Sequence, residues 1–173
     1  MRDNMSSFNL VNLKEFMNSL SGERHRTFIV HNGPATGKSK YARLFAENSK
    51  GKYFDLLERF GKDTELKNRI DVFDIRDLEN LLVEEAKDTN LLILDNVEFL
   101  LNTWDDSGYD LLFHLLAKNW DSFKPSYRAV LGVFLITNRN ILDLELNTSK
   151  GETKVFHLGR LESLEGGPEH EQD

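Results

Sequence analysis

The chain has 173 residues, a formal net charge of −7 and no cysteine. This length suits one domain with a single buried core, and the lack of cysteine excludes disulfides and thiolate chemistry. The acidic balance disfavours direct nucleic-acid binding, because neutralising phosphates needs a clustered basic face. No apolar run approaches the length of a membrane span and residues 1–5 lack a hydrophobic signal region, so we expect a cytoplasmic protein with no membrane partner.

The first predicted element is an amphipathic helix over residues 9–20, in which Leu10, Leu13 and Leu20 recur at helical spacing. A β-branched and aromatic run over residues 26–31 then predicts a buried strand. A loop follows, and the apolar spacing over residues 38–48 predicts a second helix. The order of strand, loop and helix is the one that a phosphate-binding loop requires.

The loop matches the phosphate-binding pattern of glycine, four free positions and Gly-Lys-Ser, except that Asn32 replaces the first glycine. Asparagine tolerates positive φ, so we expect Asn32 to preserve the turn. Backbone N–H groups and the helix N-terminus would surround an anion, Lys38 would reach the β- and γ-phosphates, and Ser39 would bind Mg²⁺. The alternative is a surface turn with a chance lysine. The predicted nucleotide-binding residues are Asn32, Gly33, Pro34, Ala35, Thr36, Gly37, Lys38, Ser39 and Lys40.

Further strands and helices alternate along the rest of the chain. Residues 52–56 predict a second strand, and residues 74–87 predict a helix with Asp74 as its cap. Four apolar residues ending in Asp95 predict a buried parallel strand, whose carboxyl end would place Asp95 beside the loop to hold Mg²⁺, directly or through water. An apolar strand followed by an aspartate is common by itself, so this prediction depends on the loop.

The last third of the chain predicts a helix over about 109–120, an apolar strand over 133–138 ending in Thr137 and Asn138, and a last strand over 154–158. Residues 102–108 predict a solvated loop or, alternatively, a partner-contacting loop anchored by Trp104. The alternation predicts an α/β domain over residues 1–165 with a parallel sheet covered on both faces. The acidic residues 166–173 are predicted to be a disordered tail.

These motifs, in the order loop, acid and polar strand end, resemble those of AAA+ ATPases, the additional-strand group of P-loop ATPases. The run from Leu92 to Leu100 and the later run from Leu111 to Leu116 are similar to segments of bacterial replication-initiator ATPases. The small size without a helical lid also resembles the small P-loop component of bacterial BREX phage-exclusion islands. The resemblance covers residues 28–161 and implies a five-stranded sheet of order 5-1-4-3-2, with Asn138 contacting the γ-phosphate.

The chain also departs from the AAA+ pattern. Many AAA+ enzymes have a glutamate after the acid, whereas here Asn96 cannot take a proton. Glu98 could activate water instead, or it could be a solvated or capping glutamate. Arg139 and Arg160 are candidate arginine fingers that would act on a neighbouring subunit, with an ordinary surface arginine as the alternative for each.

The sequence therefore predicts an ATP- and Mg²⁺-binding switch with slow hydrolysis, in which Lys38, Asp95, Glu98, Asn138 and Arg160 are the candidate catalytic residues. We expect it to self-associate or to dock onto a larger assembly, which could act on DNA or in phage defence. A small-molecule or nucleoside kinase is an alternative, although the basic residues are too dispersed to suggest a lid. A scaffold that binds nucleotide without hydrolysing it is another.

Overall fold

A computed structural model describes residues 9–164 of the chain. The predicted tail 166–173 and residues 1–5 lie outside this range. The sheet contains β1 (Thr27–Asn32), β2 (Lys52–Asp55), β3 (Leu91–Asp95), β4 (Val130–Ile136) and β5 (Val155–His157), all parallel and in the order β2-β3-β4-β1-β5. This arrangement confirms the α/β class and the predicted strand order. The central strands are almost wholly buried, as expected for a sheet covered on both faces.

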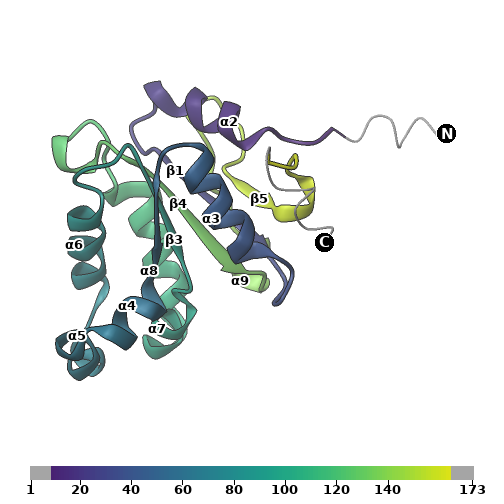
Figure 1. The fold of residues 1–173 in the computed structure, drawn as a ribbon. Helices are drawn as coiled ribbons and strands as arrows, with labels where there is room; N and C mark the ends of the chain where they lie inside the picture. Colours follow the sequence, from purple (N-terminus) through teal and green to yellow (C-terminus); the bar gives the residue numbers. More distant parts are fainter. Residues whose placement is uncertain (1–8, 165–173) are drawn as a thin grey trace.

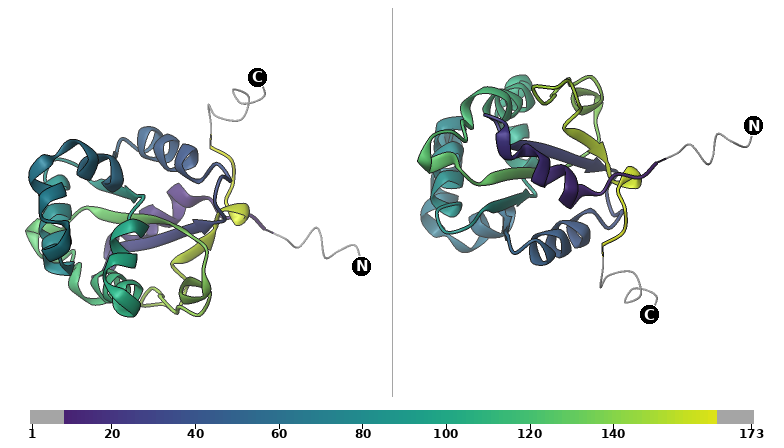
Figure 2. Two further views of the ribbon diagram at one scale, coloured as in Figure 1. Left: turned by 90° about the horizontal axis from the view of Figure 1, so that it is seen from below. Right: turned by 90° about the horizontal axis from the view of Figure 1, so that it is seen from above.

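Helices cover the two faces of the sheet unequally (Figures 1 and 2). Side chains of α2 and α3 pack with Phe28, Val30 and Phe134 against one face. The larger core on the other face gathers Leu92, Leu94 and side chains of α4, α6, α7 and α8. The described helices are α2 (Leu13–Ser19), α3 (Lys38–Asn48), α4 (Leu56–Lys62), α5 (Thr64–Asn68), α6 (Ile75–Glu85), α7 (Glu98–Thr103), α8 (Gly108–His114) and α9 (Arg139–Leu142).

Several predicted boundaries need correction. The first helix begins at Leu13, because Asn12 caps it and Val11 forms a bridge to Leu161. Residues 102–108 are largely helical, since α7 runs to Thr103 and a 3-10 turn follows over 105–107. The segment is exposed to solvent as predicted, except at Trp104 and Gly108, but the prediction of a loop there was wrong. The indole Nε1 of Trp104 donates to the Phe73 carbonyl at 2.8 Å and the ring packs on the larger core, so the side chain serves the protein's own fold.

The helix cap at Asp74 matches its prediction. The Asp74 carboxylate accepts the N–H of Asp77, and the Asp77 carboxylate accepts the N–H of Asp74, each at 3.0 Å. This reciprocal pair satisfies backbone donors that lack a partner within a helix. The segment between β2 and this helix, which carried no sequence prediction, forms α4 and α5, each capped by an aspartate.

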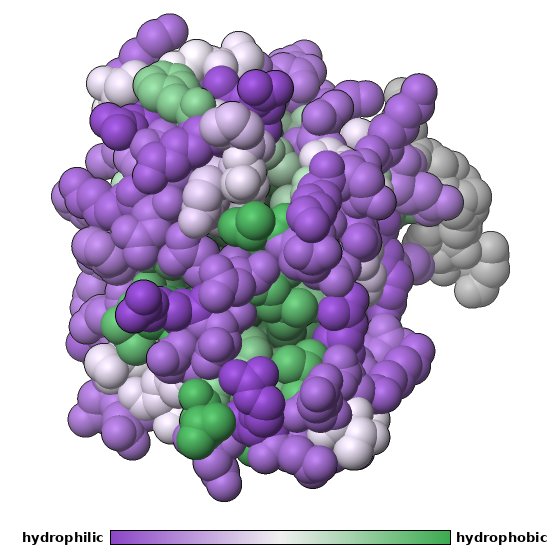
Figure 3. All heavy atoms as spheres, turned by 90° about the vertical axis from the view of Figure 1, so that its left-hand side faces the viewer, coloured by the Kyte–Doolittle hydropathy of each residue, from purple (hydrophilic) through white to green (hydrophobic). Residues whose placement is uncertain are grey.

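The side of the protein that carries α4, α5 and α6 is mostly hydrophilic, with hydrophobic atoms in interrupted patches (Figure 3). Among the large apolar side chains, Leu57 on α4 and Val72 after α5 are more than half exposed. Within residues 9–164, no helix is both long enough and apolar enough to cross a membrane.

Lys154 is a buried cation at the amino end of β5. The side chain is 2% exposed, and its Nζ donates to the His25 carbonyl at 2.8 Å and to Thr27 Oγ1 at 3.3 Å. Burial disfavours the charged form and lowers the pKa of Lys154 to about 8. An unfolded lysine has a pKa of about 10.4, so between these values the unfolded chain binds more protons and the free energy of unfolding rises with pH.

Replacement of Lys154 by methionine is expected to remove this pH dependence. Relative to the variant, the wild-type chain should gain on the order of 1–3 kcal/mol of stability between pH 7 and 10. Urea unfolding of both proteins at the two pH values measures this gain, because contributions from all other groups cancel in the difference. A difference that stays constant with pH would contradict the assignment.

Candidate functional site

The loop between β1 and α3 lies at the carboxyl end of the central strands. This is the edge at which ligands bind in open α/β sheets. Two of its residues adopt a left-handed backbone conformation, with φ of 56° at Ala35 and 83° at Gly37. A left-handed alanine costs roughly 1–2 kcal/mol, so the surrounding structure maintains an unfavourable loop conformation here.

The loop forms with Asn32 in place of glycine, but Asn32 does not adopt the positive φ for which asparagine was expected to substitute. Asn32 is the last residue of β1, and the positive φ angles fall at Ala35 and Gly37 instead. The Asn32 side chain contributes differently, since its Oδ1 accepts the N–H of Gly33 at 2.8 Å. Thr36 Oγ1 donates to the Gly33 carbonyl at 2.6 Å and closes the loop on itself.

The N-terminus of α3 faces this loop. Gly37 precedes the helix and makes no side-chain capping bond. The first N–H groups of a helix have no acceptor within the helix, and together with the helix dipole they favour an anion. A pocket of about 260 Å³ lies against these groups, lined by Pro34, Ala35, Thr36, Gly37, Lys38, Ser39, Lys40, Asn96 and Ile136.

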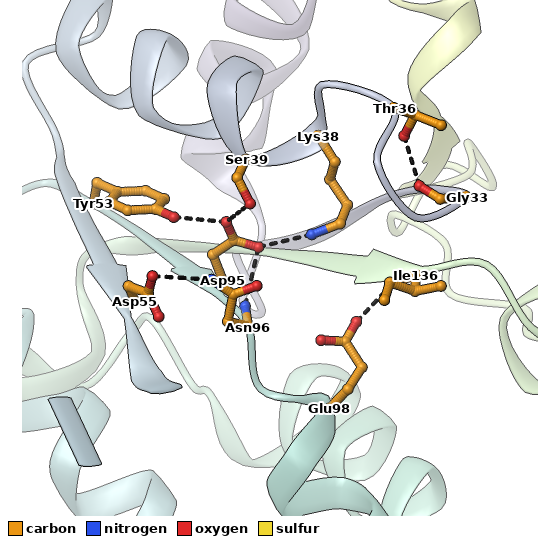
Figure 4. A network of polar contacts seen from close by, with 10 residues as sticks. All are labelled: Gly33, Thr36, Lys38, Ser39, Tyr53, Asp55, Asp95, Asn96, Glu98 and Ile136. Atoms are coloured by element: carbon orange, nitrogen blue, oxygen red, sulfur yellow. Dashed lines mark hydrogen bonds and ion pairs between the residues drawn. The ribbon is translucent and has the colours of Figure 1, made fainter. Parts of the chain in front are cut away.

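Asp95 connects the pocket to the sheet (Figure 4). It ends β3, is 0% exposed, and its Oδ1 receives Lys38 Nζ at 2.9 Å. Its Oδ2 receives Ser39 Oγ at 2.6 Å and the Tyr53 hydroxyl at 2.7 Å. Burial by itself would raise the pKa of Asp95, but these three donors outweigh it and hold the pKa below its ordinary value. Asp95 is therefore a carboxylate at neutral pH.

Two residues that carried no predicted site role complete this network. The Tyr53 side chain reaches Asp95 from β2, and burial, followed by the bond to Asp95, raises the pKa of Tyr53 and keeps its hydroxyl protonated. Asn96 has a φ of 58°, and its N–H donates to Asp95 Oδ1 at 3.0 Å while its Nδ2 donates to Asp55 Oδ2 at 2.9 Å. The strand order implied by the resemblance made β2 and β3 neighbours, but no sequence pattern indicated these hydrogen bonds.

Glu98 contacts the end of β4, whose last residue, Ile136, lines the pocket. Glu98 begins α7, and its Oε2 accepts the N–H of Ile136 at 2.7 Å, as Figure 4 shows. The bond orients the carboxylate toward the strand end. Since a carboxylate has about four lone-pair sites, acceptor capacity for a water molecule remains.

The polar residues after β4 both have partners within the protein. Asn138 caps α9, with its Oδ1 accepting the Ile141 N–H at 3.0 Å, and Thr137 Oγ1 lies 2.7 Å from His31 Nδ1. Arg139 is in α9, and exposed Arg160 follows β5 in a 3-10 turn. The loop, Ser39, Asp95, Glu98 and both arginines thus come from segments at the carboxyl edge of the sheet.

The donor set suits Mg²⁺ with a phosphate ligand. Mg²⁺ is usually bound through one or two carboxylates, substrate phosphates and several waters. Asp95 and the Ser39 hydroxyl supply two adjacent oxygens, and within residues 9–164 no group of three His, Asp or Glu side chains forms a richer metal centre. The pocket volume of about 260 Å³ is enough for a small anion such as phosphate.

No protein-family model matches the chain, and no curated protein matches it either.

Proposed function

We propose that this protein is a P-loop ATPase of the additional-strand, AAA+-like group, which binds ATP with Mg²⁺ and hydrolyses it slowly. The observation that carries the proposal is the contact of one buried carboxylate, Asp95, with both Lys38 and Ser39 beside an uncapped helix N-terminus. Cation, hydroxyl, carboxylate and free N–H groups are the components with which P-loop proteins hold a triphosphate.

The bonds to Asp95 define what each residue would do. Lys38 would turn from Asp95 to the β- and γ-phosphates, while Ser39 would present its oxygen, with Asp95, to the metal. The loop N–H groups would surround the phosphates without reorganising, since the strained conformation at Ala35 is already in place. Bound Mg²⁺ would neutralise charge that develops on the phosphate oxygens.

Slow hydrolysis follows from the residues opposite the loop. Asn96 cannot accept a proton, so Glu98 is the proposed general base. Asn138 would contact the γ-phosphate through its Nδ2 amide, since its Oδ1 accepts the Ile141 N–H and caps α9. Arg160 or Arg139 would supply the missing cation to a neighbouring subunit, which is why we propose that assembly accelerates turnover.

The proposal is tested by calorimetric titration of the full chain with ATP, in EDTA and in excess Mg²⁺. We expect binding under both conditions, tighter with Mg²⁺ by about 5- to 150-fold, the usual range of coupling between two ligands. The metal would add to affinity because Ser39 and Asp95 would hold it beside the phosphates, where its charge would offset theirs. Absence of any heat of binding in Mg²⁺ would refute the nucleotide site.

The switch component of the proposal is that bound ATP promotes self-association or docking onto a larger assembly. The resemblance to the BREX component motivates a phage-defence assembly that acts on DNA through another protein. Light scattering of the same samples with a non-hydrolysable ATP analogue should give a larger mass than without it. If the mass does not change, self-association does not depend on nucleotide.

A further inference from the structure

The Asp95 carboxylate receives two hydrogen bonds on each oxygen. Lys38 Nζ and the Asn96 N–H bind Oδ1, while Ser39 Oγ and the Tyr53 hydroxyl bind Oδ2. These four donors fill the roughly four lone-pair sites of a carboxylate. A metal can therefore approach Asp95 only after a donor leaves.

The four donors divide into two that leave and two that stay. In the proposed nucleotide complex, Lys38 turns to the phosphates and the Ser39 hydroxyl turns its oxygen to the metal, which frees one lone-pair site on each carboxylate oxygen. Asn96 is held by its bond to Asp55, and Tyr53 extends from a β-strand. These two donors continue to fix the plane of the carboxylate, one at each oxygen.

The position of the Tyr53 side chain is fixed by its contacts with the rest of the protein. It pairs with Ile93 in the β2–β3 ladder, and its ring packs on the core beneath α3. The guanidinium of Arg43 lies over the ring, 5.1 Å from its centroid. The position of the hydroxyl therefore depends on the sheet and on α3, and not on the nucleotide. A hydroxyl fixed independently of the ligand can orient Asp95 before the ligand arrives.

We propose that Tyr53 is a positioning residue that holds the Asp95 carboxylate in the orientation that Mg²⁺ requires, and thereby sets the metal affinity of the site. This inference rests on the proposed function. The Tyr53 hydroxyl does not compete with the metal. When the Ser39 hydroxyl turns its hydrogen away from Asp95, the second lone-pair site of Oδ2 becomes free for the metal.

The test is Tyr53→Phe in the full chain, with ATP affinity measured in EDTA and over a range of Mg²⁺ concentrations. ATP affinity in EDTA should match the wild type, because Lys38 and the loop remain intact. The Mg²⁺ concentration at half-maximal enhancement should rise about 10- to 100-fold, the usual effect of removing a partner of a metal ligand. The Ca²⁺ dependence should change less, since Ca²⁺ tolerates irregular geometry and Mg²⁺ does not.

Tyr127→Phe is the matched control. The Tyr127 hydroxyl also donates to a carboxylate, Glu79 Oε2 at 2.6 Å, but it lies near the amino end of β4. This variant should titrate with Mg²⁺ as the wild type does, and thermal unfolding of both variants checks the fold. An unchanged or tighter Mg²⁺ dependence in Tyr53→Phe overturns the inference while the nucleotide site stands. A wild-type chain that binds no ATP overturns both.

Discussion

Replacing Lys38 by alanine should weaken ATP binding by about 30- to 4,000-fold, with the loss present both with and without Mg²⁺. Lys38 is the buried cation of the loop region. Lys38 is 7% exposed, and its Nζ lies 2.9 Å from Asp95 Oδ1. Truncating one partner of a buried charged pair costs about 2–5 kcal/mol, and 1.4 kcal/mol corresponds to tenfold in affinity. Calorimetry measures the loss directly.

The control for Lys38→Ala is Lys62→Ala, which removes an exposed lysine paired with Glu58 and should bind ATP normally. Because Lys38→Ala leaves the buried Asp95 without its cation, it can also destabilise the fold by about 3–5 kcal/mol. The double variant Lys38→Ala/Asp95→Asn removes both charges, and its ATP affinity in EDTA, where Asp95 has no metal to hold, separates the two effects. Unchanged ATP affinity in a folded variant would refute the role of Lys38.

Replacing Glu98 by glutamine should lower ATP turnover by about 100- to 10,000-fold, which is the usual contribution of a general base, and leave ATP affinity unchanged. The structure makes this substitution conservative, since a glutamine oxygen can still accept the Ile136 N–H that Glu98 accepts at 2.7 Å. The local contact survives and only the capacity to take a proton is lost. Phosphate release under single-turnover conditions, with protein in excess, measures the chemical step.

Glu84→Gln is the matched control, because Glu84 is an exposed glutamate paired with Lys87 on the far side of the larger core. It should hydrolyse ATP at the wild-type rate. If Glu98→Gln also turns over at that rate, Glu98 has only the orienting role that its bond to Ile136 provides. If the wild type itself hydrolyses no ATP above the buffer rate, even when assembled, a nucleotide-binding scaffold replaces the ATPase.

Much of the fold could be predicted because its strongest signals are local. The helix at Lys38–Asn48 and the strand at Leu91–Asp95 have the predicted boundaries, since a 3.6-residue spacing indicates a helix and a short apolar run of this length is typical of a buried strand. Weaker local signals failed at the first helix, where a strand-like bridge between Val11 and Leu161 displaced the predicted start. That bridge joins residues far apart in sequence, so no local pattern records it.

The sequence alone predicted that Lys38, Ser39 and Asp95 form one group. These residues follow two predicted strands, and the carboxyl ends of parallel strands meet at one edge of a sheet. Only the tertiary structure decided how many hydrogen bonds the Asp95 carboxylate receives. The Tyr53 hydroxyl, the left-handed Asn96 and the bond between Glu98 and Ile136 all depend on strand pairing and on side-chain packing across the sheet. Distances between side chains on different elements follow from the three-dimensional packing, which a one-dimensional pattern does not encode.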